Sequence, residues 1–105
     1  MRFLSRAEEI ILLSIWKLQE NAYGIEILNQ VSIASGKKWS IGAIYAPLTR
    51  LLDKEYLRTY EGDSKPERGG RRKVFYELTP EGIKALEEVK KVHENIWSDI
   101  PAFNS

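Results

Sequence analysis

Residues 40–79 decide the fold and read SIGAIYAPLTRLLDKEYLRTYEGDSKPERGGRRKVFYELT. Ser40 is a good N-cap, and the apolar residues that follow recur at three- and four-residue spacing, which predicts a helix. Residues 57–60 and 73–78 are short runs rich in β-branched and aromatic residues, which predict strands. Residues 61–72 between them are polar and rich in glycine, which predicts a solvated loop. The apolar set of the predicted helix is Ile41, Ile44, Tyr45, Leu48, Leu51 and Leu52.

A helix followed by a two-stranded ribbon with a cationic tip is typical of a winged helix-turn-helix. We therefore predict a mainly α fold with a small β-hairpin. Residues 1–79 would form the DNA-binding domain, and residues 80–100 would form a C-terminal dimerisation helix continuous with it. Residues 101–105 would form a flexible tail.

Two further helices are predicted upstream of this unit. Residues 5–8, Ser-Arg-Ala-Glu, form a capping box that opens a helix running to about residue 20. Residues 23–35 predict the second helix, with Gly36 as its C-cap and Trp39 packing beneath the recognition helix. The residues expected to supply its core contacts are Ile25, Leu28, Val31 and Ile33.

The first and last predicted helices carry more apolar residues than one small core needs. Residues 10–18 are apolar round most of the helix circumference, which indicates burial on two sides, although a central core helix would look the same. Thr79 and Pro80 open the last helix as cap and first residue. Its long apolar stripe suggests a helix–helix dimer.

The composition excludes several classes of site. The 105 residues include no cysteine and one histidine, so neither a thiolate nor a multi-histidine metal site is expected, and no cofactor is predicted. Catalysis is not expected either, because the one histidine lies on a packing helix and the acids are scattered. The apolar runs, such as residues 10–13, are far too short to span a membrane, so we expect a cytoplasmic protein.

The charge is unevenly distributed along the chain. The net charge is only +1, but residues 37–73 hold ten basic and five acidic residues, a net of +5. The remaining residues hold six basic and ten acidic residues, a net of −4. A positive end on a helix-plus-hairpin unit is typical of a face that binds double-stranded DNA.

Three stretches together resemble the PadR-like transcriptional regulators: residues 40–51, residues 54–57 and residues 71–82. The resemblance covers residues 4 to about 97, and Tyr23 with Gly24 at the start of the second helix also fits it. It implies a homodimeric bacterial repressor whose DNA affinity falls when a small hydrophobic or aromatic effector binds near the dimer interface. Ala43 departs from the family pattern, which usually has threonine or serine there, and so lacks one phosphate-contacting hydroxyl.

The predicted DNA-binding residues lie on the third helix and on the wing. The helix offers few long hydrogen-bonding side chains, so we expect backbone contacts and DNA shape to contribute much of the specificity. A winged-helix module that binds another protein instead of DNA is the alternative, but it would need a neutral or acidic wing. The candidate DNA-binding residues are Lys38, Ser40, Gly42, Ala43, Tyr45, Thr49, Arg50, Lys65, Arg68, Arg71, Arg72 and Lys73.

A dimer interface that also holds an effector is predicted between the first and last helices. Trp97 would be a stacking platform for a flat aromatic molecule, with residues of the first helix as walls. His93 in the apolar stripe could equally be an ordinary, satisfied interface histidine. The candidate dimer and effector residues are Ile11, Ile15, Trp16, Leu86, Val89, His93, Ile96, Trp97 and Ile100.

Overall fold

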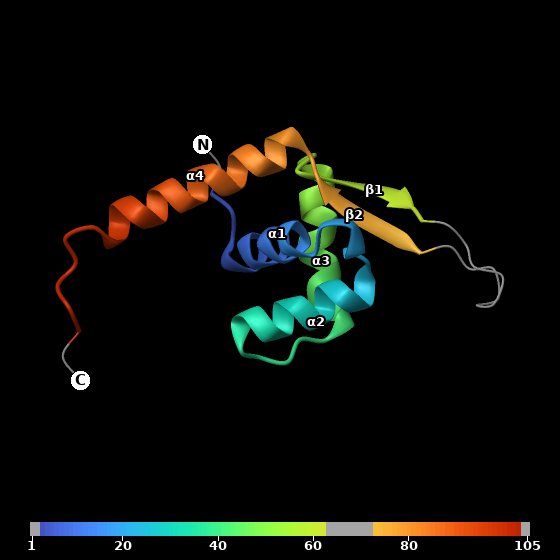
Figure 1. Cartoon of the computed structure of the whole chain (residues 1–105), viewed down its shortest axis with the longest axis horizontal. Coiled ribbons are helices and arrows are strands. Elements are labelled where there is room, and N and C mark those ends of the chain that lie inside the picture. The colour runs from blue at the N-terminus through green and yellow to red at the C-terminus, as the bar shows by residue number, and fades with distance from the viewer. Residues whose placement is uncertain (1–2, 63–72, 104–105) are drawn as a thin grey trace.

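The computed structural model describes residues 3–62 and 73–103, and it confirms the mainly α fold with one β-hairpin (Figure 1). The predicted solvated loop lies almost wholly outside the described residues. Four helices surround a small core, and the two strands form an antiparallel wing at one side. The elements are α1 (Arg6–Leu18), the 3-10 turn η1 (Gln19–Asn21), α2 (Gly24–Ser35), α3 (Ile41–Asp53), β1 (Leu57–Glu61), β2 (Val74–Leu78) and α4 (Pro80–Trp97).

The helix α1 is the centre of the fold, because it contacts α2, α3, α4 and β2. Its start has the predicted capping box: the Ser5 amide donates to Glu8 Oε1 at 2.8 Å, and the Glu8 amide donates to Ser5 Oγ at 3.1 Å. Ile11, Leu12 and Ile15 are fully buried, while Leu13 and Trp16 are half exposed. The second apolar side predicted for this helix is therefore present, and in the single chain it is half exposed to solvent.

The helix α2 ends at the predicted residue, and α3 begins at the predicted one, while α2 begins one residue later than predicted, with Tyr23 as its N-cap. Gly36 closes α2 in the left-handed conformation with φ +69°, which a residue with a side chain rarely adopts. Ser40 caps α3, because its Oγ accepts a hydrogen bond from the Ala43 amide at 3.1 Å. Trp39 lies between the two helices, part-buried against the core, and its indole N–H donates to Ser35 Oγ at 2.8 Å.

The core face of α2 was predicted incorrectly at two of its four positions. Ile25 and Ile33 are exposed, and the fully buried residues of this helix are Ile27 and Val31. Ile27 and Val31 are one turn apart and share a face, whereas Ile25 lies on the other side of the helix. The exposed Ile25 becomes part of the functional surface described below.

The wing is held to the body of the domain by backbone hydrogen bonds and by aromatic side chains. Tyr60 and Phe75 are direct partners in the hairpin, and their rings stack with centroids 5.4 Å apart. The Phe75 ring also meets the Tyr23 ring edge-on at 5.4 Å, and the Tyr76 amide donates to the Ala22 carbonyl at 2.8 Å. The chain at residues 22–23 thus extends the hairpin and fixes the direction of the wing.

Two chain segments, residues 55–56 and residue 79, are hydrogen-bonded to each other where the wing meets α4. Thr79 alone separates β2 from α4, and its Oγ1 donates to the Glu55 carbonyl at 2.6 Å and accepts from the Gly82 amide at 3.1 Å. The Thr79 amide donates to the Tyr56 carbonyl at 3.1 Å. The Tyr56 amide in turn donates to the Leu51 carbonyl at 3.0 Å. Both ends of the hairpin are therefore pinned at one point.

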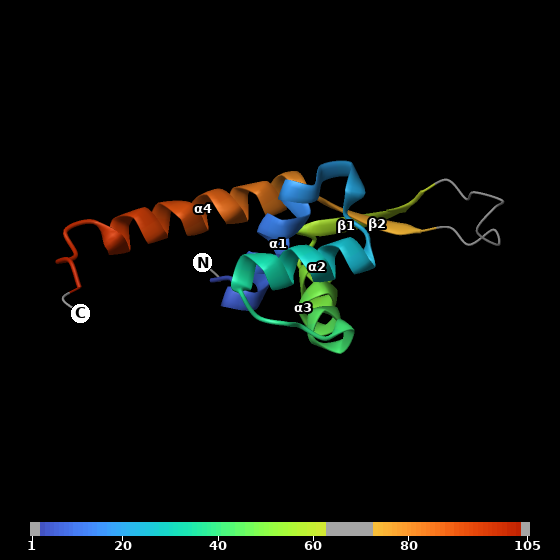
Figure 2. The same cartoon turned by 60° about the horizontal axis from the view of Figure 1, so that its bottom comes forward.

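From this junction α4 leads away from the body of the domain (Figures 1 and 2). Its first half packs on the core through the part-buried residues Ile83 and Leu86. The helix ends at Trp97, so Ile100, which was predicted on the helix, lies beyond it. In the predicted tail, the Phe103 ring contacts the Trp97 ring edge-on, with centroids 6.2 Å apart.

A buried carboxylate joins α1 to the C-terminal end of α3. Glu8 is only 2% exposed, and its Oε2 lies 2.8 Å from Lys54 Nζ and 3.7 Å from Arg50 Nε. Burial acts to raise the pKa of the Glu8 carboxyl, but the hydrogen bonds from Lys54 and Ser5 outweigh it and lower the pKa below its ordinary value. Glu8 therefore stays ionised in the folded protein at neutral pH and fixes α3 against α1.

Candidate nucleic-acid interface

One face of α3 is exposed from its cap to its last turn. The buried residues of α3 are Ile44, Pro47, Leu48 and Leu51, a set that differs from the predicted apolar set. Pro47 belongs to the core face, whereas Ile41 and Tyr45, predicted within the apolar stripe, are 51% and 57% exposed. The exposed predicted DNA-binding residues of this region are Lys38, Ser40, Gly42, Ala43, Tyr45, Thr49 and Arg50.

Gly42 has no structural reason to be glycine. A Cβ built at this position would meet only Ser40 Oγ, at 4.0 Å, and the backbone of Gly42 is not in the left-handed region. Ala43 and Ala46 beside it are also small and exposed. The start of α3 is therefore a smooth surface whose backbone another molecule can approach closely.

Three of the described basic residues near this face contact an acid or an aromatic ring. Arg50, at the far end of α3, lies near Glu8, and Arg58 on β1 forms a 2.7 Å ion pair with Glu77 on β2. Lys73 Nζ lies 4.1 Å from the centre of the Tyr23 ring, a cation–π contact at the base of the wing. The predicted wing contacts Lys65, Arg68, Arg71 and Arg72 lie outside the described residues.

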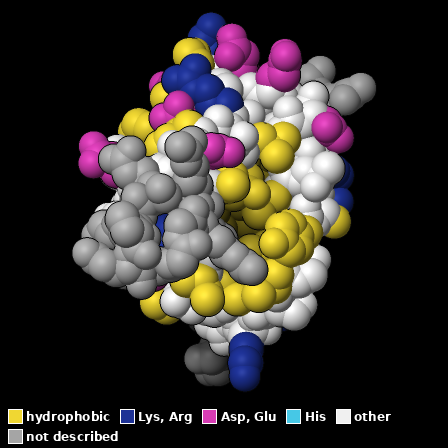
Figure 3. All heavy atoms as spheres, turned by 90° about the vertical axis from the view of Figure 1, so that its right-hand side faces the viewer, with side chains coloured by type: hydrophobic (Ala, Val, Ile, Leu, Met, Phe, Trp, Pro, Cys, Tyr) yellow, Lys and Arg dark blue, Asp and Glu magenta, His cyan; other side chains and the backbone are white. Residues whose placement is uncertain are grey.

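A hollow of about 270 Å³ opens where α2, α3 and β2 meet. Figure 3 shows hydrophobic side chains gathered round a hollow on the face that carries the wing. Burial raises the pKa of the Tyr76 hydroxyl in its wall, and the neighbouring Tyr45 raises it further, so the Tyr76 hydroxyl stays protonated at neutral pH. The exposed residues among those that line it are Gly24, Ile25, Ile41, Tyr45 and Val74.

Sequence reasoning missed Ile25 and Val74 as surface residues and placed Ile41 in the core. The signal that could have identified Ile25 was its place two residues from Ile27, on the other side of the same helix. Ile41 directly follows the cap, where the helix has only begun to pack on its neighbours. Nothing in the sequence pattern brings β2 and its Val74 to the same hollow, because this depends on the tertiary fold.

A second, larger hollow of about 690 Å³ lies between α1 and α4. Four of the nine residues predicted for a dimer and effector site line it: Trp16, Leu86, Val89 and His93. His93 is satisfied, since its Nε2 lies 3.2 and 3.1 Å from the two Glu9 carboxylate oxygens. That contact joins the middle of α4 to α1 and closes one edge of the hollow.

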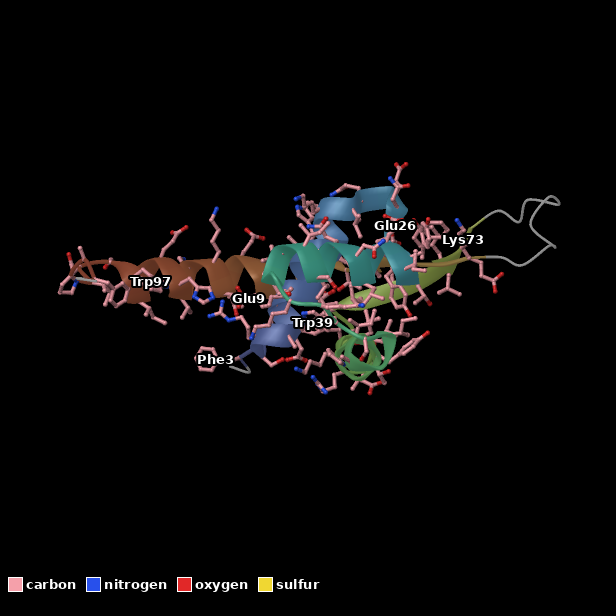
Figure 4. The ribbon with its side chains drawn as sticks, turned by 90° about the horizontal axis from the view of Figure 1, so that it is seen from below. Phe3, Glu9, Glu26, Trp39, Lys73 and Trp97 are labelled. Carbon is pink, nitrogen blue, oxygen red and sulfur yellow. The ribbon has the colours of Figure 1, made fainter. Side chains whose placement is uncertain are left out.

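The other five residues predicted for this second site do not line the hollow; they are Ile11, Ile15, Ile96, Trp97 and Ile100. Ile11 and Ile15 are core residues with no exposed surface to offer a ligand, because they occupy the inner side of α1. Trp97 is 60% exposed at the outer end of α4, far along the helix from Glu9, as Figure 4 shows. One chain therefore does not bring Trp97 and Trp16 together.

No helix within residues 3–62 and 73–103 is long and apolar enough to cross a membrane. Among the same residues, no three histidine, cysteine or acidic side chains cluster to bind a metal ion.

Comparisons with known proteins agree with this architecture. The model of the transcriptional regulator PadR-like family matches residues 12–88. A PadR family transcription regulator from Clostridium difficile R20291 is 31% identical, with 85% of this chain and 88% of that chain covered and a TM-score of 0.63. RosR from H. salinarum shares the fold at 24% identity, with 94% of this chain and 83% of that chain covered and a TM-score of 0.71. A PadR-like transcription factor from Bacteroides fragilis also shares it at 24% identity, with 86% of this chain and 81% of that chain covered and a TM-score of 0.67.

No curated protein matches the chain. The family model nevertheless spans the second half of the core helix α1, the exposed helix α3, the hairpin and the first half of α4. The chain therefore belongs to the transcriptional regulator PadR-like family, whose members are transcription regulators and not enzymes.

Proposed function

We propose that the protein is a sequence-specific DNA-binding repressor that docks α3 in the major groove and the wing beside it. The observation that carries this proposal is the exposed, small-residue start of α3, at which Gly42 leaves the backbone open. Ser40 and Lys38 precede it and supply a hydroxyl and a cation for phosphates. The recognition helix of this class of motif contacts base edges with its N-terminal residues.

The wing supplies most of the attraction to phosphates. Two of the described basic residues in residues 37–73, Lys54 and Arg58, are bound to acids, and Arg50 lies close to one. The positive charge available to DNA on this side of the fold therefore rests on Lys37, Lys38, Lys73 and the wing sequence between Gly62 and Lys73. A bacterial regulator of this kind would act in the cytoplasm.

Replacing both Arg71 and Arg72 with alanine is expected to weaken binding to all duplexes about equally. Each lost phosphate contact should lower the slope of log affinity against log salt by roughly one unit. The measurement is a fluorescence-anisotropy titration at several salt concentrations, using duplex DNA from the region upstream of the protein's own gene.

The matched control for this experiment removes the same charge elsewhere, through Lys17→Ala and Lys91→Ala on the exposed sides of α1 and α4. The control variant should keep the wild-type slope. Equal slopes for the wild type and the Arg71/Arg72 variant would contradict the role of the wing. No duplex binding by the wild type would contradict the whole proposal and favour a protein-binding module.

The same proposal includes a homodimer formed through α1 and α4. The 690 Å³ hollow is largely apolar, and the half-exposed side chains of Leu13 and Trp16 face it. The outer half of α4 adds the exposed Ile96 and Trp97, which have no core to pack on within one chain. Two-fold pairing of these surfaces would place two recognition helices on half-sites about 10 base pairs, or roughly 34 Å, apart.

We further propose that a small flat apolar effector occupies this hollow in the dimer and releases the protein from DNA. The volume of the hollow lies within the range of small-molecule sites, roughly 300–1,000 Å³. Trp16 is the aromatic wall that one chain provides, and Trp97 would have to come from the partner copy. Release requires the ligand to bind better when the recognition helices are wrongly spaced for DNA.

Flat two- and three-ring aromatic compounds are expected to quench the tryptophan fluorescence of the wild-type protein on titration. Trp16→Phe should lose most of this quenching, because its indole lies in the wall of the hollow. Trp39→Phe is the control, since Trp39 lies part-buried between α2 and α3 and should leave the quenching unchanged. The absence of saturable quenching in the wild type would contradict an effector site.

A further inference from the structure

We propose that Ile41 and Tyr45 read the 5-methyl groups of thymine in the operator, so that apolar contacts determine part of the sequence specificity. This inference rests on the proposed function and adds to it which chemical feature of the bases is recognised. The fold leaves a group of apolar residues exposed on this face although they contribute nothing to its core.

The exposed apolar residues gather on one face. Ile25 on α2, Ile41 and Tyr45 on α3 and Val74 on β2 all line the 270 Å³ hollow, and each is at least 46% exposed. Contiguous exposed apolar surface rimmed by polar groups marks an interaction site. Here three different elements contribute to one patch, which is next to the base of the wing (Figure 3).

The position of the patch favours DNA as its occupant. Ile41 is the first residue of α3 and Tyr45 lies about one turn later, on the end of the recognition helix that contacts base edges. Lys73, which Figure 4 shows at the base of the wing, borders the same hollow and lies over the Tyr23 ring, so a cation lies beside the apolar residues. The patch is thus continuous with the proposed DNA-binding face.

The chemistry of the major groove identifies the target. Its base edges present hydrogen-bond donors and acceptors, and the only apolar group among them is the thymine methyl. The start of α3 offers apolar side chains and small residues in place of amides or guanidinium groups, with Arg50 at the far end near Glu8. A methyl-reading surface therefore accounts for a recognition helix that is poor in polar side chains.

The experiment uses the full-length protein and a duplex that it selects from a random pool. Each thymine of the selected half-sites is replaced in turn by uracil, which lacks only the 5-methyl group. We expect one or two positions at which this replacement weakens binding roughly fourfold per half-site, the loss for one buried methyl group. At one of these positions at least, the one that Ile41 reads, Ile41→Ala should bind the thymine and uracil duplexes equally.

Ile33→Ala is the matched control, because Ile33 is a 74% exposed isoleucine near the end of α2 that does not line the hollow. This variant should keep the full preference for thymine. The inference is overturned if a tightly bound selected duplex tolerates uracil at every position, or if Ile41→Ala keeps the preference. Failure of the selection to enrich any duplex would instead overturn the proposed function.

Discussion

Gly82→Ala is expected to destabilise the protein by about 2 to 3 kcal/mol, the upper part of the usual range for an overpacked site. Gly82 is buried in the first turn of α4, and a Cβ at this position would overlap the carbonyl oxygen of Tyr56 and lie 3.0 Å from its carbonyl carbon. Tyr56 cannot move aside easily, because its carbonyl accepts from Thr79 and its amide donates to Leu51. The added methyl group would therefore separate two pinned chain segments.

The measurement is the midpoint of thermal unfolding, followed by circular dichroism at equal protein concentrations. For a domain of this size the loss corresponds to a fall of roughly 10 °C or more. Gly24→Ala is the control, since Gly24 is also in the first turn of a helix but a Cβ there would have no neighbour within 4 Å. It should be neutral or slightly stabilising. A Gly82→Ala protein with the wild-type midpoint would show that the Tyr56 backbone can move aside without loss of stability.

Ile96→Asp is expected to convert the proposed dimer into a monomer. Ile96 is 58% exposed in a single chain, on the outer half of α4, where the apolar stripe continues beyond the core. If a second copy covers this stripe, each aspartate would be buried without a partner, which costs about 3 to 5 kcal/mol. The two symmetric copies together should weaken dimerisation by roughly a thousandfold or more.

Light scattering and sedimentation at micromolar concentration measure this change. Asn95→Asp is the matched control, because it adds the same charge to the neighbouring exposed position, which lies on the opposite side of the helix from Leu86. This control should remain dimeric. A monomeric wild type would contradict the homodimer, and a dimeric Ile96→Asp protein would move the interface away from the outer half of α4.

Much of the fold could be predicted because it depends on local signals. Ser5, Ser40 and Thr79 each cap a helix through a hydrogen bond within three residues, and Gly36 ends one through its own backbone conformation. Such signals are complete within a few residues of sequence. The close approach of Gly82 to the Tyr56 carbonyl was not predicted, because it joins residues that are far apart in the chain.

The exposed face of α3 could be predicted in outline, and its apolar character could not. Periodicity assigns an isoleucine to the core wherever it fits the stripe, and this placed Ile41 with Ile44 although only Ile44 is buried. Which side of a short helix faces inward depends on its neighbours. For the same reason Ile15 was assigned to an effector site, when the packing of α1 at the centre of the fold buries it completely.

The junction at Thr79 couples the wing rigidly to α4. Only one residue separates β2 from α4, and hydrogen bonds to Glu55 and Tyr56 leave no free hinge there. In a dimer held through α4, a small rotation between the two copies of that helix would swing each wing through the same angle. The long arm of α4 then amplifies a change at the subunit contact into a change in the distance between the two wings, without any rearrangement inside either domain.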